Sequence, residues 1–152
     1  MEKLEIKTGI QIAKSRAEVY EAIVDPAKMS NYFISESTGN LVEGTSVNWK
    51  FPEFEGDVLI EVNKVIPNEF VAFKWEGAKG KKLKVEITLM EMPDKSTLVK
   101  VTEGKMEADD AGITWYGGNT EGWANFLACL KAYLEYGINL RKGAFEFKKG
   151  EF

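Results

Sequence analysis

The chain has 152 residues, of which 44% are hydrophobic and 29% charged, and its formal net charge is −4. These values are typical of one soluble globular domain, and no basic face predicts binding to nucleic acid. Histidine is absent and Cys129 is the only cysteine, which excludes Ser–His–Asp and Cys–His nucleophilic sites, zinc sites built from histidine or several thiolates, and an internal disulfide. We therefore assign no catalytic residue, no metal and no cofactor.

The N-terminal residues 4–12 alternate between apolar and polar side chains, which predicts a half-buried strand rather than a signal peptide. No run of about 18 apolar residues predicts a membrane span. Together with the single cysteine, this favours a cytoplasmic protein. Ser15 to Glu18 has the form of a capping box, which predicts a short helix from Ala17 to Val24. Pro26 then favours a second short helix over residues 27–32.

The hydrophobic period changes to two between Ser35 and Met106. Turns rich in Gly, Pro, Asn and Asp separate the segments with this alternation, which are 46–51, 58–63, 71–76, 83–89 and 98–102. Because no long helix lies between them, they predict an antiparallel meander with one apolar, aromatic face. The acidic run from Glu107 to Asp110 follows, and we interpret it as a solvated loop, with a lid over a cavity as the alternative.

The longest helix candidate runs from Asn119 to Leu140, with Thr120 as its N-cap and Gly117 and Gly118 breaking the chain before it. At about 100° per residue, its apolar side chains form one stripe. The stripe contains Trp123, Phe126, Leu127, Leu130, Leu134 and Ile138. Such a stripe requires a cover, and the apolar face of the sheet supplies it, in a two-layer α+β arrangement.

We therefore predict a curved antiparallel sheet of about six to seven strands, wrapped around a long C-terminal helix, with two short helices after the first strand. Residues 1–140 form the predicted domain, and residues 141–152 form a tail in which Phe145, Phe147 and Phe152 alternate with charges. The tail is expected to pack back on the domain, to extend a sheet edge or to remain loose.

Five stretches of the chain resemble, in order and spacing, the activator of heat-shock-protein-90 ATPase homologues (Aha-type) within the START-like (SRPBCC, helix-grip) superfamily. They are VYEAIVDP at 19–26, VNWKF at 47–51, VIPNE at 65–69 followed by FKW at 73–75, TLVKVTEG at 97–104, and the residues Gly122-Trp123, Leu127, Leu130-Lys131 and YLEYG in 122–137. The resemblance covers residues 4–140 and leaves the tail outside.

The resemblance implies that the sheet grips the closing helix and often leaves an apolar cavity between them. In the superfamily such cavities bind lipids, sterols, hormones or polyketides, and some members cyclise or dehydrate the bound molecule. Co-chaperone members carry this domain after an N-terminal chaperone-binding domain, which has no counterpart here. From the fold alone, function follows only by analogy.

Large aromatic and apolar side chains on the predicted inner surfaces are the candidate cavity lining, because pockets are mostly apolar with a few polar anchors. The candidate ligand-binding residues are Tyr32, Phe33, Trp49, Phe51, Phe73, Trp75, Trp115, Tyr116, Trp123, Phe126, Leu127 and Leu130. The alternative for each is a place in an ordinary core. Tyr32 and Tyr116 are placed at the cavity entrance, where a phenol could orient a ligand.

Three classes of function follow. The first is a carrier or sensor of a small hydrophobic molecule, which predicts an enclosed void of several hundred Å³ with one or two polar atoms facing in. The second is a protein-binding module, with a chaperone or another protein as partner, which predicts a filled core and an exposed apolar patch. The third is an enzyme acting on a hydrophobic ligand, which predicts a buried carboxylate or tyrosine converging on the cavity. The first is our main prediction.

Overall fold

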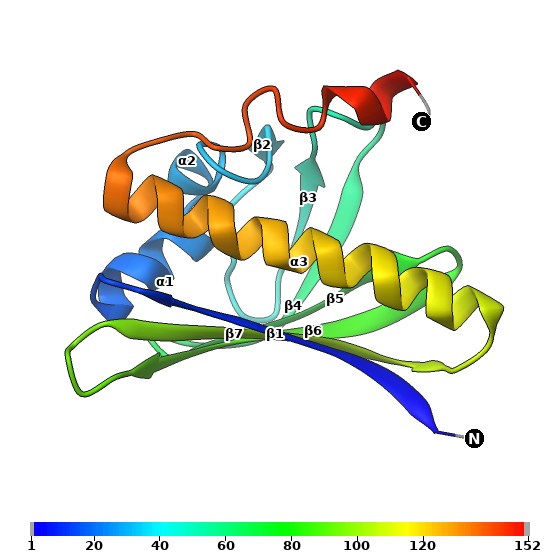
Figure 1. The fold of residues 1–152 in the computed structure, drawn as a ribbon, viewed down its shortest axis with the longest axis horizontal. Helices are drawn as coiled ribbons and strands as arrows, with labels where there is room; N and C mark the ends of the chain where they lie inside the picture. Colours follow the sequence, from blue (N-terminus) through cyan, green and yellow to red (C-terminus); the bar gives the residue numbers. More distant parts are fainter. Residues whose placement is uncertain (1, 151–152) are drawn as a thin grey trace.

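The computed structural model describes residues 2–150, so Phe152 of the tail lies outside the described residues. Figure 1 shows a single curved sheet with a long helix, α3 (Asp110–Tyr136), lying across it. The strands, in chain order, are β1 (Lys3–Ile12), β2 (Glu36–Ser37), β3 (Ser46–Lys50), β4 (Val58–Ile66), β5 (Phe70–Ala78), β6 (Lys81–Glu91) and β7 (Thr97–Glu107). The shorter helices are α1 (Arg16–Val24), α2 (Pro26–Met29) and the 3-10 helix η1 (Glu146–Gly150).

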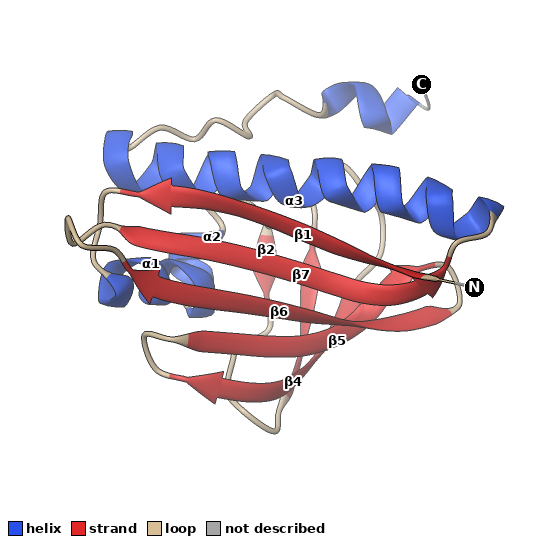
Figure 2. Cartoon of the chain, turned by 60° about the horizontal axis from the view of Figure 1, so that its bottom comes forward, coloured by secondary structure: helices blue, strands red, loops and turns tan. Residues whose placement is uncertain are grey.

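All neighbouring strands pair antiparallel, in the order β1-β7-β6-β5-β4-β3-β2. The meander from β2 to β7 therefore keeps its sequence order, and β1 adds to the edge formed by β7. Figure 2 shows that the sheet is strongly twisted and that α3 covers one of its faces. The predicted α+β helix-grip architecture is confirmed.

The capping box predicted before the first helix is present, since the Ser15 hydroxyl accepts a hydrogen bond from the Glu18 backbone N–H. Asp25 then caps α2 by accepting from the Ala27 backbone N–H at 2.9 Å. The second helix was predicted to extend to residue 32, but α2 ends at Met29. Residues 30–33 continue as turns, which bring Tyr32 and Phe33 into the core.

The core lies between the concave face of the sheet and α3. In β6, for example, Leu83, Val85, Ile87 and Leu89 are buried while the side chains between them face outward. This is the alternation that the period of two predicted. No helix of residues 2–150 is long and apolar enough to cross a membrane.

The long helix begins nine residues earlier than predicted. Asp109 is its N-cap and accepts from the Gly112 backbone N–H at 2.8 Å, so the acidic run ends β7 and starts a helix instead of forming a loop. Gly117 and Gly118 lie inside α3 and do not break it. The predicted Thr120 N-cap was wrong for the same reason, because position 120 is mid-helix.

The helix also ends earlier, at Tyr136, because Gly137 adopts a left-handed conformation with φ 66°. Glycine takes this conformation without the penalty that a Cβ brings, and it terminates helices for that reason. Ile138, which we expected in the core, therefore lies beyond the helix and is exposed. The tail then turns back along α3 towards the first half of the helix and ends in η1 (Figures 1 and 2).

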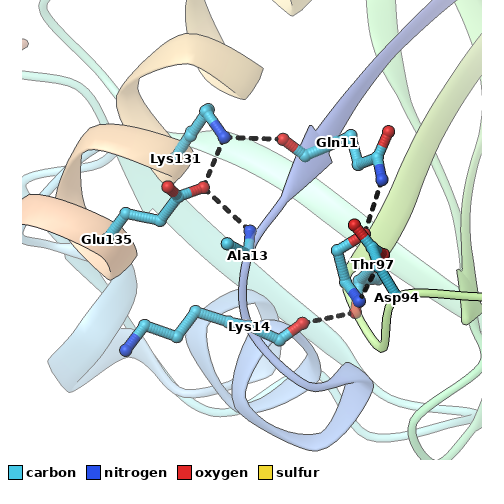
Figure 3. Close-up of polar contacts among 8 residues, drawn as sticks. Gln11, Ala13, Lys14, Asp94, Thr97, Lys131 and Glu135 are labelled. Carbon is cyan, nitrogen blue, oxygen red and sulfur yellow. Dashed lines mark hydrogen bonds and ion pairs between the residues drawn. The ribbon is translucent and has the colours of Figure 1, made fainter. Parts of the chain in front are cut away.

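A polar cluster fixes the second half of α3 to the end of β1 (Figure 3). Lys131 pairs with Glu135 one turn later and donates to the Gln11 carbonyl at 2.8 Å, while Glu135 accepts from the Ala13 backbone N–H at 2.8 Å. These hydrogen bonds lower the pKa of Glu135, the contact with Lys131 being the larger cause. The cluster sets the position of the helix over the sheet, and with it the shape of the space between them.

Candidate functional site

A pocket of about 270 Å³ opens between the first half of α3, the ends of β3 and β5, the β3–β4 loop and the tail. This volume is slightly below the range of about 300–1,000 Å³ that is typical of small-molecule sites. The lining residues are Phe33, Phe51, Phe54, Val58, Trp75, Glu76, Gly77, Gly118, Asn119, Gly122, Trp123, Asn125, Arg141, Phe145 and Lys148. The pocket is thus small and largely aromatic, with polar groups at its rim and on α3.

Aromatic rings form the inner walls. The Trp75 and Trp123 rings lie 5.4 Å apart, and the Phe33 ring lies 5.1 Å from Phe51 and 6.1 Å from Trp123, measured between centroids. Most contacts among the core aromatics behind them are edge-to-face, which is a favoured arrangement of aromatic pairs. The walls are therefore held rigidly and present flat apolar surfaces to the pocket.

Two glycines keep the helix side of the pocket open. Gly118 and Gly122 are one turn apart on α3, both line the pocket, and a Cβ added at either would meet no atom within 4 Å. Glycine inside a helix costs about 0.5–1 kcal/mol relative to alanine. Larger side chains at these two positions would project into the pocket, so the space exists because the sequence has glycine there.

A buried carboxylate fixes two of the pocket-lining rings. Glu103 in β7 is 0% exposed, and its oxygens accept from the indole N–H groups of Trp75 and Trp123, both at 2.8 Å, and from the Asn119 amide at 3.1 Å. Asn119 also donates to the Gly77 carbonyl at 3.0 Å. Hydrogen bonds to a charged acceptor are roughly twice as strong as neutral ones. Glu103 therefore orients both indoles and ties α3 to β5 and β7.

Gly77 is the point of closest approach in this network. A Cβ at position 77 would lie 1.9 Å from a carboxylate oxygen of Glu103 and 2.9 Å from the Trp75 indole nitrogen. No real Cβ tolerates these distances, so β5 needs glycine here for the carboxylate to reach both rings.

The tail forms the outer wall of the pocket. Arg141 forms an ion pair with Glu53 of the β3–β4 loop, and both side chains are largely buried, with 13% and 4% exposed. The Arg141 guanidinium also lies 4.8 Å from the Phe145 ring centroid and 5.5 Å from that of Phe33. These contacts hold the start of the tail against the domain, so that Phe145 and Lys148 reach the pocket.

The structure brings only part of the predicted lining together. Phe33, Phe51, Trp75 and Trp123 line the pocket. The remaining apolar candidates are buried in the core away from it, namely Trp49, Phe73, Phe126, Leu127 and Leu130.

The other three candidates lie elsewhere. Tyr32 is buried beside a second hollow under the tail, and its hydroxyl donates to the Ala22 carbonyl at 2.8 Å. Burial also raises the pKa of the Tyr32 phenol well above its ordinary value. Trp115 is buried on α3 outside the pocket, and Tyr116 is exposed on the same helix.

Several lining residues were missed by reasoning from the sequence. Gly118 and Gly122 carried a usable signal, because glycines spaced one turn apart in a helix indicate a close approach or an open space. Arg141, Phe145 and Lys148 belong to the tail, whose path no local pattern indicated. Glu103 alternates in phase with buried residues of β7, and this placed a carboxylate on the apolar face.

Among residues 2–150, no group of three or more Cys, Asp or Glu side chains is arranged to hold a metal ion. The only cysteine is buried, and burial raises the pKa of the Cys129 thiol. The described polar side chains that line the pocket, apart from the two indoles, are two amides (Asn119 and Asn125), one carboxylate (Glu76) and two cations (Arg141 and Lys148).

Known structures share this architecture. The protein SSP2350 from Staphylococcus saprophyticus is 30% identical over 91% of this chain and 96% of its own, with a TM-score of 0.80. DynU16, from the dynemicin biosynthetic locus, is 24% identical over 88% of this chain and 48% of its own, with a TM-score of 0.77. The Aha1 dimer from Colwellia psychrerythraea is 24% identical over 88% of this chain and 98% of its own, with a TM-score of 0.74.

No curated protein sequence matches the chain significantly. The family model described as "Activator of Hsp90 ATPase homolog 1-like protein" matches residues 13–135, from the end of β1 to the last turn of α3. This span includes the sheet from β2 to β7, the glycines of α3 and the Glu103 network, while the tail lies beyond it. The chain therefore belongs to the Activator of Hsp90 ATPase homolog 1-like family, within the START-like superfamily.

Proposed function

We propose that this protein binds a small hydrophobic molecule with a flat ring system in the pocket between β5, α3 and the tail. The observation that carries the proposal is the opening left by Gly118 and Gly122 in a pocket that is also lined by the Trp75 and Trp123 rings. A helix that only needed to cover a core would gain stability from alanine at both positions. The pocket favours a ligand-binding role over the protein-binding module, for which we expected a filled interior.

The polar groups of the pocket also fit ligand binding. Small-molecule sites are mostly apolar, with a few well-placed polar groups that fix orientation. Asn119 offers its side-chain carbonyl, since its amide N–H groups are used by Gly77 and Glu103. Asn125 is half-buried and lines the same wall of α3. The structural neighbour DynU16 is described as a putative protein in the dynemicin biosynthetic locus, and a biosynthetic setting agrees with the proposal.

An enzyme acting on a hydrophobic ligand was the third candidate, and Glu103 is the buried carboxylate that such an enzyme would need. Its side chain is fully enclosed, however, and both oxygens already accept hydrogen bonds from neighbouring side chains. A general base must reach the proton that it removes. Glu103 is therefore better suited to positioning the two indole rings than to reacting with a ligand.

The test is a fluorescence titration with phenylnaphthylamine, a neutral aromatic probe whose emission rises in apolar surroundings. We expect the wild-type protein to bind the probe and the Gly122→Leu variant to bind it roughly tenfold more weakly or not at all, because the leucine side chain fills the pocket.

The matched control is Gly117→Leu, on the same exposed half of α3 but outside the pocket lining. Both substitutions replace a helical glycine with a better helix former, so both variants should remain folded. Equal probe binding by the two variants, or no binding by the wild type, would overturn the proposal.

A further inference from the structure

The charged groups around the pocket differ in how they can reach a ligand. Glu103 is sealed behind the indole rings, and Glu76 is exposed at the rim. Arg141, whose side chain is largely buried, and Lys148, which is half-buried, both come from the tail and line the pocket directly. Among residues 2–150, the charged side chains that line the pocket and are partly shielded from water are therefore both cations.

Both cations have hydrogen-bonding capacity left over. Arg141 uses one end of its guanidinium for Glu53, whereas its buried Nε–H has no hydrogen-bond partner among the described residues. Lys148 lies 5.0 Å from the Phe145 ring centroid and forms no ion pair within residues 2–150. A buried donor without an acceptor is unfavourable, so a ligand oxygen that becomes the acceptor of the Nε–H group after a small rotation of the Arg141 side chain offsets that cost.

From these contacts, we propose that the pocket selects aromatic molecules that carry an anionic group, a carboxylate or a sulfonate, and that Arg141 and Lys148 recognise the anion. The proposal rests on the ligand-binding function proposed above and assigns the chemical class of the ligand. The aromatic body would lie between Trp75, Trp123 and Phe51, and the anion would face the tail. Glu53 neutralises much of the Arg141 charge and Glu76 is exposed at the rim, so Lys148 supplies the main unpaired positive charge inside the pocket.

The experiment compares two probes with the same aromatic skeleton, anilinonaphthalene sulfonate and the neutral phenylnaphthylamine, which differ in the sulfonate. We expect the wild-type protein to bind the sulfonate more tightly. In Lys148→Gln the sulfonate should bind about five- to tenfold more weakly, as expected for the loss of one partly shielded hydrogen bond to a charge, while the neutral probe is unaffected.

Two further variants make the comparison specific. Lys149→Gln removes the neighbouring cation, which pairs with Glu146 and does not line the pocket. This variant should bind both probes with the wild-type affinity. Arg141→Lys keeps a positive charge for Glu53 but removes the Nε–H donor and the planar guanidinium. It should therefore weaken binding of the sulfonate probe and leave binding of the neutral probe unchanged. Near-ultraviolet circular dichroism verifies that each variant retains the wild-type fold.

Equal affinity of the wild type for both probes, or an equal loss for both in Lys148→Gln, would overturn the assignment of an anionic ligand. In that case binding of the neutral probe that is lost in Gly122→Leu would still support the proposed function. If the wild type does not bind the neutral probe, the proposed function fails, and this inference, which rests on it, fails as well.

Discussion

Glu103 is the residue on which the geometry of the pocket depends most. Its carboxylate is fully buried and accepts from three neutral donors, and Gly77 leaves the space that it needs. A buried polar network stabilises a protein only when all its members are satisfied. At the scale of single residues, the Glu103 network therefore fixes the positions of Trp75 and Trp123 and makes the pocket wall rigid.

Glu103→Gln should lower the free energy of unfolding by about 1–3 kcal/mol, because the amide nitrogen of glutamine must face an indole or amide N–H donor. Urea unfolding measures the loss, and the indole N–H signals of Trp75 and Trp123 should move in a nitrogen–proton correlation spectrum. Glu86→Gln in β6 is the control, since Glu86 is half-exposed and its one ion pair within the described part of the chain is with Lys84, at 3.6 Å. It should change stability by no more than about 0.5 kcal/mol. If Glu103→Gln changes neither the free energy of unfolding nor the two indole signals, the three hydrogen bonds do not hold the rings.

At the scale of elements, α3 combines two functions along its length. Its second half is held by the contacts of Lys131 and Glu135 with β1, and its first half carries the glycines that open the pocket. The hydrophobic stripe of the second half was visible in the sequence because it has a helical period. The first half was not, because glycines and exposed side chains such as Ile113 interrupt the period. The local signal for the true start of the helix is Asp109, whose side chain is a favourable N-cap.

The anchor of α3 predicts a dependence of stability on pH. The pKa of Glu135 is lowered by its hydrogen bonds from Lys131 and Ala13. The stabilisation that ionised Glu135 gives to the folded state is therefore complete above the unfolded-state pKa, which is about 4.3 for glutamate. It disappears as the pH falls through the lower folded-state pKa. Glu135→Gln should destabilise the protein by about 1 kcal/mol at neutral pH, and the difference from the wild type should shrink towards pH values near 3.

Urea unfolding at a series of pH values measures this difference. Glu121→Gln, at an exposed position on the same helix, is the control and should show no such difference. A gap between Glu135→Gln and the wild type that is independent of pH would mean that the ionised carboxylate does not hold the helix.

For the molecule as a whole, the fold was predictable because each of its layers has a regular hydrophobic period. The alternation in the strands and the stripe on the closing helix together indicated a sheet gripping a helix, and the family match agrees with it. The site was predictable only where it overlaps that pattern, as at Trp75 and Trp123. Apolar periodicity cannot separate a ring that borders a cavity from one, such as Phe73, that is packed on all sides. The tail joins the pocket through an ion pair between residues 88 positions apart, Glu53 and Arg141, and no local signal indicates such a contact.

The most direct test of the proposed pocket uses the four tryptophans as reporters. Trp75 and Trp123 line the pocket, whereas Trp49 and Trp115 are buried outside it. Phenylnaphthylamine is titrated into isotope-labelled protein, and the four indole N–H signals are followed in a nitrogen–proton correlation spectrum. The signals of Trp75 and Trp123 should shift progressively and saturate, while those of Trp49 and Trp115 stay in place. Shifts confined to Trp49 or Trp115, or no saturable shift at any of the four, would contradict ligand binding in this pocket.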